Sequence, residues 1–200
     1  MNTYSDSTTE YYGSHFIDLD FSKREMASKV FEECEFKRCD FSAAALTQSK
    51  FVDCTFLECN LSLAKVKASK FSGVEFNECK AVGINWTAAA WSKLITAAPL
   101  KFRKCILHDS SFFGLTLVDF VIEECKARDV DFRETNLSDA LCCHTDFTGS
   151  LFSRTNLSGA DFTDAIHYDI DVLNNEIKGA KFSRYEALRL LDSLEIELVD

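Results

Sequence analysis

Proline and glycine are scarce in this sequence, and no long apolar run occurs in it. One proline and seven glycines among 200 residues do not suit a turn-rich β-sandwich, whose tight loops draw on both residue types. No apolar stretch approaches the roughly 18 residues of a membrane-spanning helix. The N-terminus has no basic stretch followed by an apolar core, as a signal peptide would have. We therefore expect a single soluble, cytoplasmic domain with no membrane contact.

An excess of positive charge is also missing. The formal net charge is -10, which argues against direct nucleic-acid binding and favours a basic partner or plain solubility. The charge is unevenly spread, because residues 105–176 hold 4 Lys and Arg against 14 Asp and Glu, whereas residues 1–104 hold 14 against 13. Almost all of the excess negative charge is therefore expected on the second half of the molecule.

Bulky apolar residues recur at every fifth position. One series runs from Phe16 to Trp91, and a second runs from Phe102 to Phe182, one residue out of phase with the first. A period of five gives no fixed stripe on a helix, and on a straight strand it sends successive residues to opposite faces. A chain that turns a corner in every repeat resolves the conflict. The residue two before each bulky centre is small, so each repeat is expected to send one large and one small side chain inward.

A second period, four repeats long, sets the size of one coil. The segment FEECEF at 31–36 returns as FVDCTF at 51–56, and TNLSDA at 135–140 returns as TNLSGA at 155–160. Four repeats per coil predict an all-β, right-handed, quadrilateral β-helix of about eight coils, stacked by strand pairing. Phe16, Phe36, Phe56 and Phe76 should form one ladder of stacked rings, and Phe31, Phe51, Phe71 and Trp91 should form another.

The pattern divides the chain into five parts. Residues 1–13 carry no repeat and are expected to form a tail or cap. Residues 14–91 form the first half of the β-helix, and 102–182 form the acidic second half. Residues 92–101 contain the only proline and are interpreted as a bulged loop or a kink between the halves. Residues 183–200 predict a short helix, with Ser183 and Glu186 at capping-box spacing, followed by a strand.

Residues that could carry chemistry are better explained as structure. The nine cysteines mostly occupy the small inward position and are read as small core hydrophobes. The run Cys142, Cys143, His144 lacks a second pair of metal ligands. His108, Asp109 and Ser110 are adjacent, which is not the spatial arrangement of a catalytic triad. His167 falls at a centre and is read as a tolerated core or end-coil residue. We predict no catalytic, cofactor-binding or metal site, and hence no enzyme.

Two surfaces are the candidate functional regions. The acidic surface is predicted to comprise Asp109, Asp119, Glu123, Glu124, Asp129, Asp131, Glu134, Asp139 and Asp169. The alternative reading is a solvated acidic face without a partner. The open end of a β-helix needs covering, and the C-terminal elements could cap it or pair with a second copy in a two-fold dimer. The dimerisation residues would be Leu188, Leu191, Leu194, Ile196 and Leu198.

The sequence resembles the pentapeptide-repeat proteins that protect DNA gyrase, most closely the albicidin-resistance members, with the quinolone-resistance (Qnr) proteins as wider relatives. The resemblance covers nearly the whole chain. It is carried by CNLSLA at 59–64, GINWTAAAW at 83–91, CILHDSSFFGL at 105–115, IHYDIDVLNNEIKGAKFS at 166–183 and DSLEIELVD at 192–200.

The resemblance implies a homodimer joined through its C-termini, whose DNA-like acidic surface binds the DNA-binding saddle of the gyrase A subunit, or topoisomerase IV, and relieves drug inhibition. It also implies a protective loop, here Trp91, Lys93, Leu94, Ile95 and Pro99. No second long insertion of the kind found in Gram-negative Qnr proteins is present, which places albicidin ahead of quinolones as the drug. The alternative is a pentapeptide-repeat scaffold with a partner other than a topoisomerase.

Overall fold

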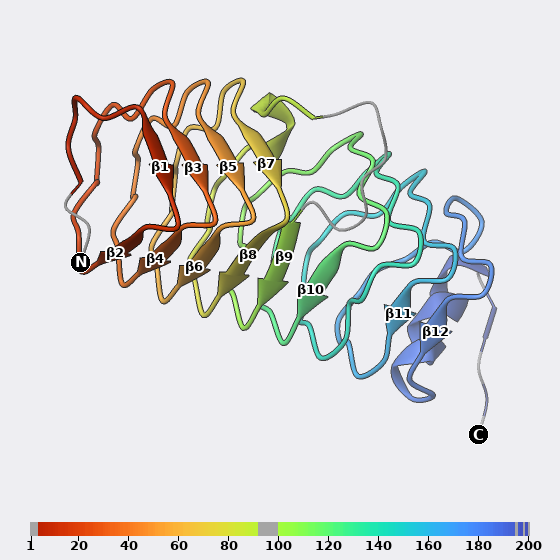
Figure 1. Cartoon of the computed structure of the whole chain (residues 1–200). Helices are drawn as coiled ribbons and strands as arrows, with labels where there is room; N and C mark the ends of the chain where they lie inside the picture. Colours follow the sequence, from red (N-terminus) through yellow and green to blue (C-terminus); the bar gives the residue numbers. More distant parts are fainter. Residues whose placement is uncertain (1–3, 92–99, 195, 198, 200) are drawn as a thin grey trace.

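The chain winds into a rod of stacked coils (Figure 1). The structure is a computed structural model, and it describes residues 4–91, 100–194, 196, 197 and 199. About eight turns of β-helix are followed by a short C-terminal 3-10 helix, and every strand pair is parallel. The β-helical fold expected from the five-residue and four-repeat periods is confirmed.

Short parallel strands form two of the four sides of the rod. One side carries a four-stranded sheet in the order β1 (Glu10–Tyr12), β3 (Val30–Glu32), β5 (Lys50–Val52) and β7 (Lys70–Ser72). The adjacent side carries β2 (His15–Ile17), β4 (Glu35–Lys37), β6 (Thr55–Leu57), β8 (Val74–Asn77), β9 (Leu100–Arg103) and β10 (Val121–Glu123). Further along, β11 (Asp161–Phe162) pairs with β12 (Lys181–Phe182). Elsewhere the coils are joined by isolated bridges such as Asp40 with Asn60.

Aromatic ladders fill the interior because each inward residue lies directly over its counterpart in the next coil. The rings of Phe16, Phe36, Phe56 and Phe76 stack with centroids 4.7–5.0 Å apart, as predicted. Tyr11 continues the neighbouring ladder, since its ring stacks on Phe31 at 5.2 Å. The expectation that residues 1–13 lie outside the repeats was therefore wrong for Glu10–Tyr12, which form β1. Tyr4 then covers the first coil, with its ring 4.8 Å from that of Phe21.

Trp91 was predicted to extend the Phe71 ladder, and this prediction was wrong. Trp86 is the residue that lies edge-on against Phe71, with centroids 5.4 Å apart. Trp86 also stacks on Phe112 at 5.9 Å and begins the short 3-10 helix η1 (Trp86–Ala88). The indole of Trp91 is half-buried, and its Nε1 donates a hydrogen bond of 2.9 Å to the carbonyl oxygen of Trp86. An indole N–H needs a partner, and this carbonyl provides one.

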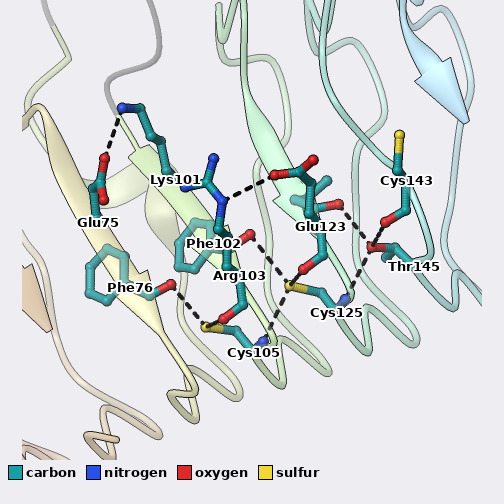
Figure 2. A network of polar contacts seen from close by, with 11 residues as sticks. Glu75, Phe76, Lys101, Phe102, Arg103, Cys105, Glu123, Cys125, Cys143 and Thr145 are labelled. Carbon is teal, nitrogen blue, oxygen red and sulfur yellow. Dashed lines mark hydrogen bonds and ion pairs between the residues drawn. The ribbon is translucent and has the colours of Figure 1, made fainter. Parts of the chain in front are cut away.

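The small inward side chains form a second kind of ladder, of hydrogen bonds. Figure 2 shows the thiol of Cys105 donating to the carbonyl oxygen of Phe76, and that of Cys125 donating to the carbonyl oxygen of Phe102. The backbone N–H of each coil in turn donates to the next side chain, as from Cys105 to Cys125 Sγ and from Cys125 to Thr145 Oγ1. Burial raises the pKa of the Cys125 and Cys142 thiols. Cysteine, serine and threonine here connect coils.

The break between the two halves is an insertion within one coil. Every other strand pair keeps the four-repeat register, as between Phe56 and Phe76. At the break, Phe76 pairs with Phe102 and Val74 with Leu100, so that the partner lies six residues later in the sequence than the register requires. The second half begins with β9 at Leu100, two residues before the predicted boundary at 102. Phe76 and Phe102 still stack at 4.8 Å. The coils on the two sides of the insertion therefore stay in register, while residues 92–99, for which a bulged loop or a kink was expected, lie outside the described residues.

The last coil departs from the five-residue period. His167 was placed at an inward centre, but its side chain is exposed, whereas Tyr168 is fully buried. The ring of Tyr168 packs against Phe162 and Phe182, with centroids 5.8 and 5.4 Å away. Burying the large aromatic ring is favourable, although the Tyr168 hydroxyl has no hydrogen-bond partner among the described residues. The coil therefore slips by one residue.

Candidate functional site

The acidic side chains of the second half lie mostly at the corners of the coils. In each repeat the residue two after the centre turns the corner with a left-handed backbone. Asp109, Asp119, Glu124, Asp129, Glu134 and Asp139 have φ between 52° and 58° and are all exposed. This conformation is unfavourable for residues with a side chain, but each corner N–H donates to the next coil, as from Asp129 to the Thr148 carbonyl oxygen at 2.9 Å.

The corner carboxylates are distributed over all four long edges of the rod. Asp109 and Asp129 lie one coil apart and share one edge, and Asp119 and Asp139 share another. Glu124 and Glu134 lie one on each of the two remaining edges. The second half is thus acidic all round, and the predicted set does not gather on one face.

Asp169 does not continue the Asp109–Asp129 edge as the sequence suggested. In the last coil the left-handed corner is taken by His167, with φ 57°, because of the one-residue slip. Asp169 is exposed nearby. Gly149 interrupts the same edge, and the Asp129 carboxylate occupies the space that a Cβ would take there.

Three of the nine predicted carboxylates are neutralised by ion pairs. Glu123 pairs with Arg103 at 3.1 Å, Asp131 pairs with Arg133 at 2.8 Å, and Glu134 pairs with Arg154. Glu123 and Asp131 are also half-buried. Within the described part of the chain, the other six make no ion pair: Asp109, Asp119, Glu124, Asp129, Asp139 and Asp169. These six are the carboxylates free to meet a basic partner.

Two carboxylates outside the predicted acidic surface, those of Asp146 and Asp161, stabilise the second half. Asp146 accepts hydrogen bonds from Arg128 at 2.8 Å and from Thr148, and lies 3.1 Å from His167 Nδ1. Partial burial raises the pKa of Asp146, but the bonds from Thr148 and Arg128 outweigh it and hold this pKa well below its ordinary range. Hydrogen bonds from Thr163, together with Lys181 at 3.0 Å, lower the pKa of Asp161 to about 2. The spacing of one coil between Asp161 and Lys181 would have predicted this ion pair from the sequence.

The C-terminal helix η2 (Glu186–Leu194) is fastened to the last coil by polar side chains. The predicted capping box does not form. Glu186 instead accepts from the backbone N–H of His167 at 2.7 Å, and Ser183 Oγ accepts from that of Asp164 at 2.8 Å. Arg189 donates to the carbonyl oxygen of Tyr168 at 3.1 Å. The side chains of Ser183 and Glu186 bond to the N–H groups of the last coil, because those groups have no further coil to accept them.

Apolar side chains remain exposed on this C-terminal end. Leu190 packs against the core, and Leu191 is half-buried. Leu188 and Ile196 are each 53% exposed, and Leu194 is 39% exposed. Ile196, Glu197 and Val199 are outside any strand, contrary to the predicted terminal strand, and Leu198 lies outside the described residues. The end of the rod is thus covered by η2, but η2 leaves apolar surface of its own uncovered.

The predicted protective loop is largely outside the described part of the chain. Lys93, Leu94, Ile95 and Pro99 belong to residues 92–99, which the structure does not describe. Its two flanks are fixed, by the Trp91 hydrogen bond to Trp86 and by Leu100, which is fully buried in β9.

Neither a metal centre nor a membrane span is apparent in what the structure describes. Over residues 4–91, 100–194, 196, 197 and 199, no three His, Cys, Asp or Glu side chains come together as metal ligands. Over the same residues, no helix is long and apolar enough to cross a membrane. Cys142 is buried at a centre, while Cys143 beside it points outward and is half-buried.

Comparison with known proteins places the fold. No curated protein sequence matches significantly. Among solved structures, a trypsin-treated variant of QnrB1, described as a plasmid-mediated fluoroquinolone resistance protein, is 24% identical, with a TM-score of 0.60 over 96% of this chain and 92% of that chain. Full-length QnrB1 is 19% identical, with a TM-score of 0.56 over 94% and 100%. These identities establish a shared fold only.

Two family models match the sequence. The model described as "Pentapeptide repeat region" matches residues 29–95, and that described as "Pentapeptide repeats (8 copies)" matches residues 124–166. The two segments lie on either side of the insertion and together span more than half of the chain. The chain belongs to the pentapeptide-repeat family.

Proposed function

We propose that this protein is a cytoplasmic, non-enzymatic DNA mimic that binds DNA gyrase and protects it from inhibitors, albicidin-type drugs first and quinolones second. Topoisomerase IV is the second target of the same surface. The observation that carries the proposal is the set of exposed carboxylates on the edges of the second half that make no ion pair within the described residues. The likeness of the fold to a fluoroquinolone resistance protein along nearly the whole chain supports it.

The edges of the rod resemble a polyanion in spacing and rigidity. Asp109 and Asp129 follow each other at the coil spacing of about 4.8 Å, as do Asp119 and Asp139. A DNA duplex carries one charge per about 1.7 Å of its axis, so the mimicry is partial. A protein site shaped for DNA offers lysine and arginine side chains, and exposed carboxylates fixed on a rigid backbone can pair with them without further ordering.

A second copy of the chain would lengthen this acidic rod. We propose that Leu188, Leu191, Leu194, Ile196 and Leu198 meet their counterparts across a two-fold axis, which joins the two acidic halves end to end. Exposed apolar side chains at a rod end favour such self-association. We propose that the protective loop, with Trp91, Lys93, Leu94, Ile95 and Pro99, contributes to protection from the drug.

Supercoiling by purified gyrase, with and without albicidin or a quinolone, tests the function. The protein should restore supercoiling in the presence of albicidin at micromolar concentration and should bind the A subunit. No rescue together with no binding would exclude the proposal, and would leave a scaffold with another partner.

Two matched double variants identify the edge that is used. Asp109→Asn with Asp129→Asn removes one edge, and Asp119→Asn with Asp139→Asn removes the other. Asparagine tolerates the left-handed corner, so both variants should fold alike. Loss of the charges on the edge that faces gyrase should weaken binding tenfold or more. The same loss should reduce the salt dependence of binding. Equal, negligible effects of both variants would contradict an acidic contact on either edge.

Sedimentation measures the dimer separately. Leu188→Lys with Ile196→Lys should convert a dimer to a monomer. Leu63→Lys is the control, because Leu63 is 61% exposed and lies in the first half of the rod. A monomeric unchanged protein would refute the dimer without bearing on the gyrase contact of one rod.

A further inference from the structure

Four lysines gather at one edge of the first half, far from the acidic region. Lys50 in β5 and Lys70 in β7 are direct partners in the parallel sheet. Lys65 and Lys67 flank the buried Val66 on the adjacent side of the rod. The two sides meet at the left-handed corner residues Gln48 and Ala68. All four lysines are exposed, and together they form what we name the lysine patch.

The lysine patch places like charges side by side. Some neighbouring coils place opposite charges in register, as in Asp18 with Arg38, Glu75 with Lys101, and Arg103 with Glu123. Others place like charges one coil apart, as in Asp20 with Asp40. Like charges directly opposite each other on paired strands are destabilising, yet Lys50 faces Lys70. Within residues that the structure describes, none of the four forms an ion pair. Folding stability does not explain this arrangement.

The surroundings of the lysine patch are mostly small or uncharged. The outward residues of the same two sides include Ala45, Thr47, Gln48, Ser72, Asn85 and Thr87. Among the described residues, nearby carboxylates include the exposed Glu32, opposite Val52, and the exposed Asp53, which follows β5. A negatively charged object would therefore meet the lysines from the side away from β3.

We propose that the lysine patch binds the phosphate backbone of a nucleic-acid duplex, without sequence preference. Lysine ammonium groups are point charges suited to phosphates. A protein partner fits less well, because protein interfaces are enriched in aromatic residues and arginine and depleted in lysine. Single strands are bound by stacking on aromatic side chains, and the patch exposes none. The four lysines contact phosphates as point charges, and we therefore expect no preference for a base sequence.

The net charge of -10 does not prevent this contact. Exposed charges are screened over about 8 Å at physiological ionic strength, and one coil rises about 4.8 Å. The lysine patch therefore acts locally, although the whole chain is acidic. The expectation of no direct nucleic-acid binding was based on the net charge of the whole chain. The fold places the two halves, with their different charges, at opposite ends of the rod. The contact does not depend on gyrase binding, and the two can fail separately.

Anisotropy of a fluorescein-labelled duplex of about 20 base pairs tests the proposal, with the full chain and a series of salt concentrations. The unchanged protein should bind at low salt, and four phosphate contacts should give a slope of log K against log salt of about -3.6. Replacing Lys50, Lys65, Lys67 and Lys70 by glutamine should lower the affinity at least tenfold and flatten the slope.

A matched control replaces four other exposed lysines by glutamine, namely Lys23, Lys80, Lys104 and Lys126, with the same change in net charge. It should alter duplex affinity less than twofold. Thermal unfolding should show that both variants fold, with the patch variant no less stable because a like-charge pair is removed. No salt-dependent binding by the unchanged protein, or equal losses in the two variants, would overturn the proposal. Tighter binding of poly-glutamate or of a single strand than of the duplex would also overturn it.

Discussion

The two halves of the rod share one interior and differ in their surfaces. Rings stack in both, with centroids 4.9 Å apart for Phe56 and Phe76 and 5.4 Å apart for Phe112 and Phe132. Outside, the first half leaves the four lysines of the lysine patch without an ion pair. In the second half the arginines are bound to carboxylates, and eight carboxylates make no ion pair within the described residues, namely the six of the predicted surface with Asp171 and Glu176. The inward residues set the shape, and the three outward residues of each repeat are free to set the charge.

The largest effect is expected from breaking one ring ladder in each half. Phe56→Ala and Phe132→Ala each remove a fully buried ring stacked on both sides, and each should cost about 3–5 kcal/mol. If the insertion leaves the halves coupled, both variants should lower one shared unfolding transition, followed by circular dichroism in urea. Two separate transitions would show that the halves unfold independently. Phe113→Ala, at a 41% exposed ring, is the control and should cost less than about 1 kcal/mol.

The next effect concerns the hydrogen-bond ladder. Thr145→Val keeps the volume but leaves the Ile122 carbonyl oxygen and the Cys125 N–H without their side-chain partner, at a cost of about 1–3 kcal/mol. Ser69→Ala should do the same in the first half, where Ser69 donates to the Leu46 carbonyl oxygen at 2.5 Å. Thr116→Val, at an exposed position, should be nearly neutral. Equal stability of all three variants in urea would show that the interior ladder contributes nothing.

A smaller, pH-dependent effect is expected from Asp161 in the second half. Because the pKa of Asp161 is lowered to about 2, its stabilisation is complete above the ordinary aspartate pKa of about 4 and is lost as the pH falls toward 2. Asp161→Asn should cost about 1 kcal/mol at pH 7 and progressively less below pH 4. Stability measured at several pH values checks this, and a deficit that persists unchanged at pH 2 would disprove it.

The smallest effect is one of reactivity without loss of stability. Eight of the nine cysteines are buried, and Cys143 alone is half-buried. Because a thiolate is the reactive form and burial raises the pKa of Cys142 and Cys143, a thiol reagent should label the native protein slowly and at one position. Cys143→Ser should abolish that labelling. Fast modification of two or more thiols in the native protein would mean that the interior opens locally.

The interior could be predicted from the sequence almost residue by residue. A rigid four-repeat register converts spacing directly into contact, which is why the Phe16 to Phe76 ladder was foreseen. The failures come where register changes. The insertion adds six residues to one coil. In the sequence it appeared as a phase shift of one residue, because six is one more than the five residues of a repeat. Tyr168 takes the last inward position in place of His167, with its hydroxyl left without a partner among the described residues, and the five-residue period alone does not predict that change.

The candidate site was less predictable, because it depends on which edge each outward residue occupies. The nine carboxylates were chosen by sequence charge, and the corner geometry spread them over four edges. Ion pairs such as Arg154 with Glu134 follow the one-coil spacing and could have been foreseen from it. The use of Glu186 to accept the N–H of His167 could not, because it depends on how η2 lies across the last coil.

The insertion has a consequence for how such a protein can change over time. Trp91 and Leu100 are each held by contacts to the coils beside them, and these contacts do not involve the residues in between. The free energy of closing a loop grows only slowly with its length, by about 0.6 kcal/mol for each doubling. Residues can therefore be gained, lost or exchanged between these two anchors while the coils before and after stay aligned. Under the proposed function, selection by a new inhibitor would act on this one segment, while the rest of the chain keeps its fold.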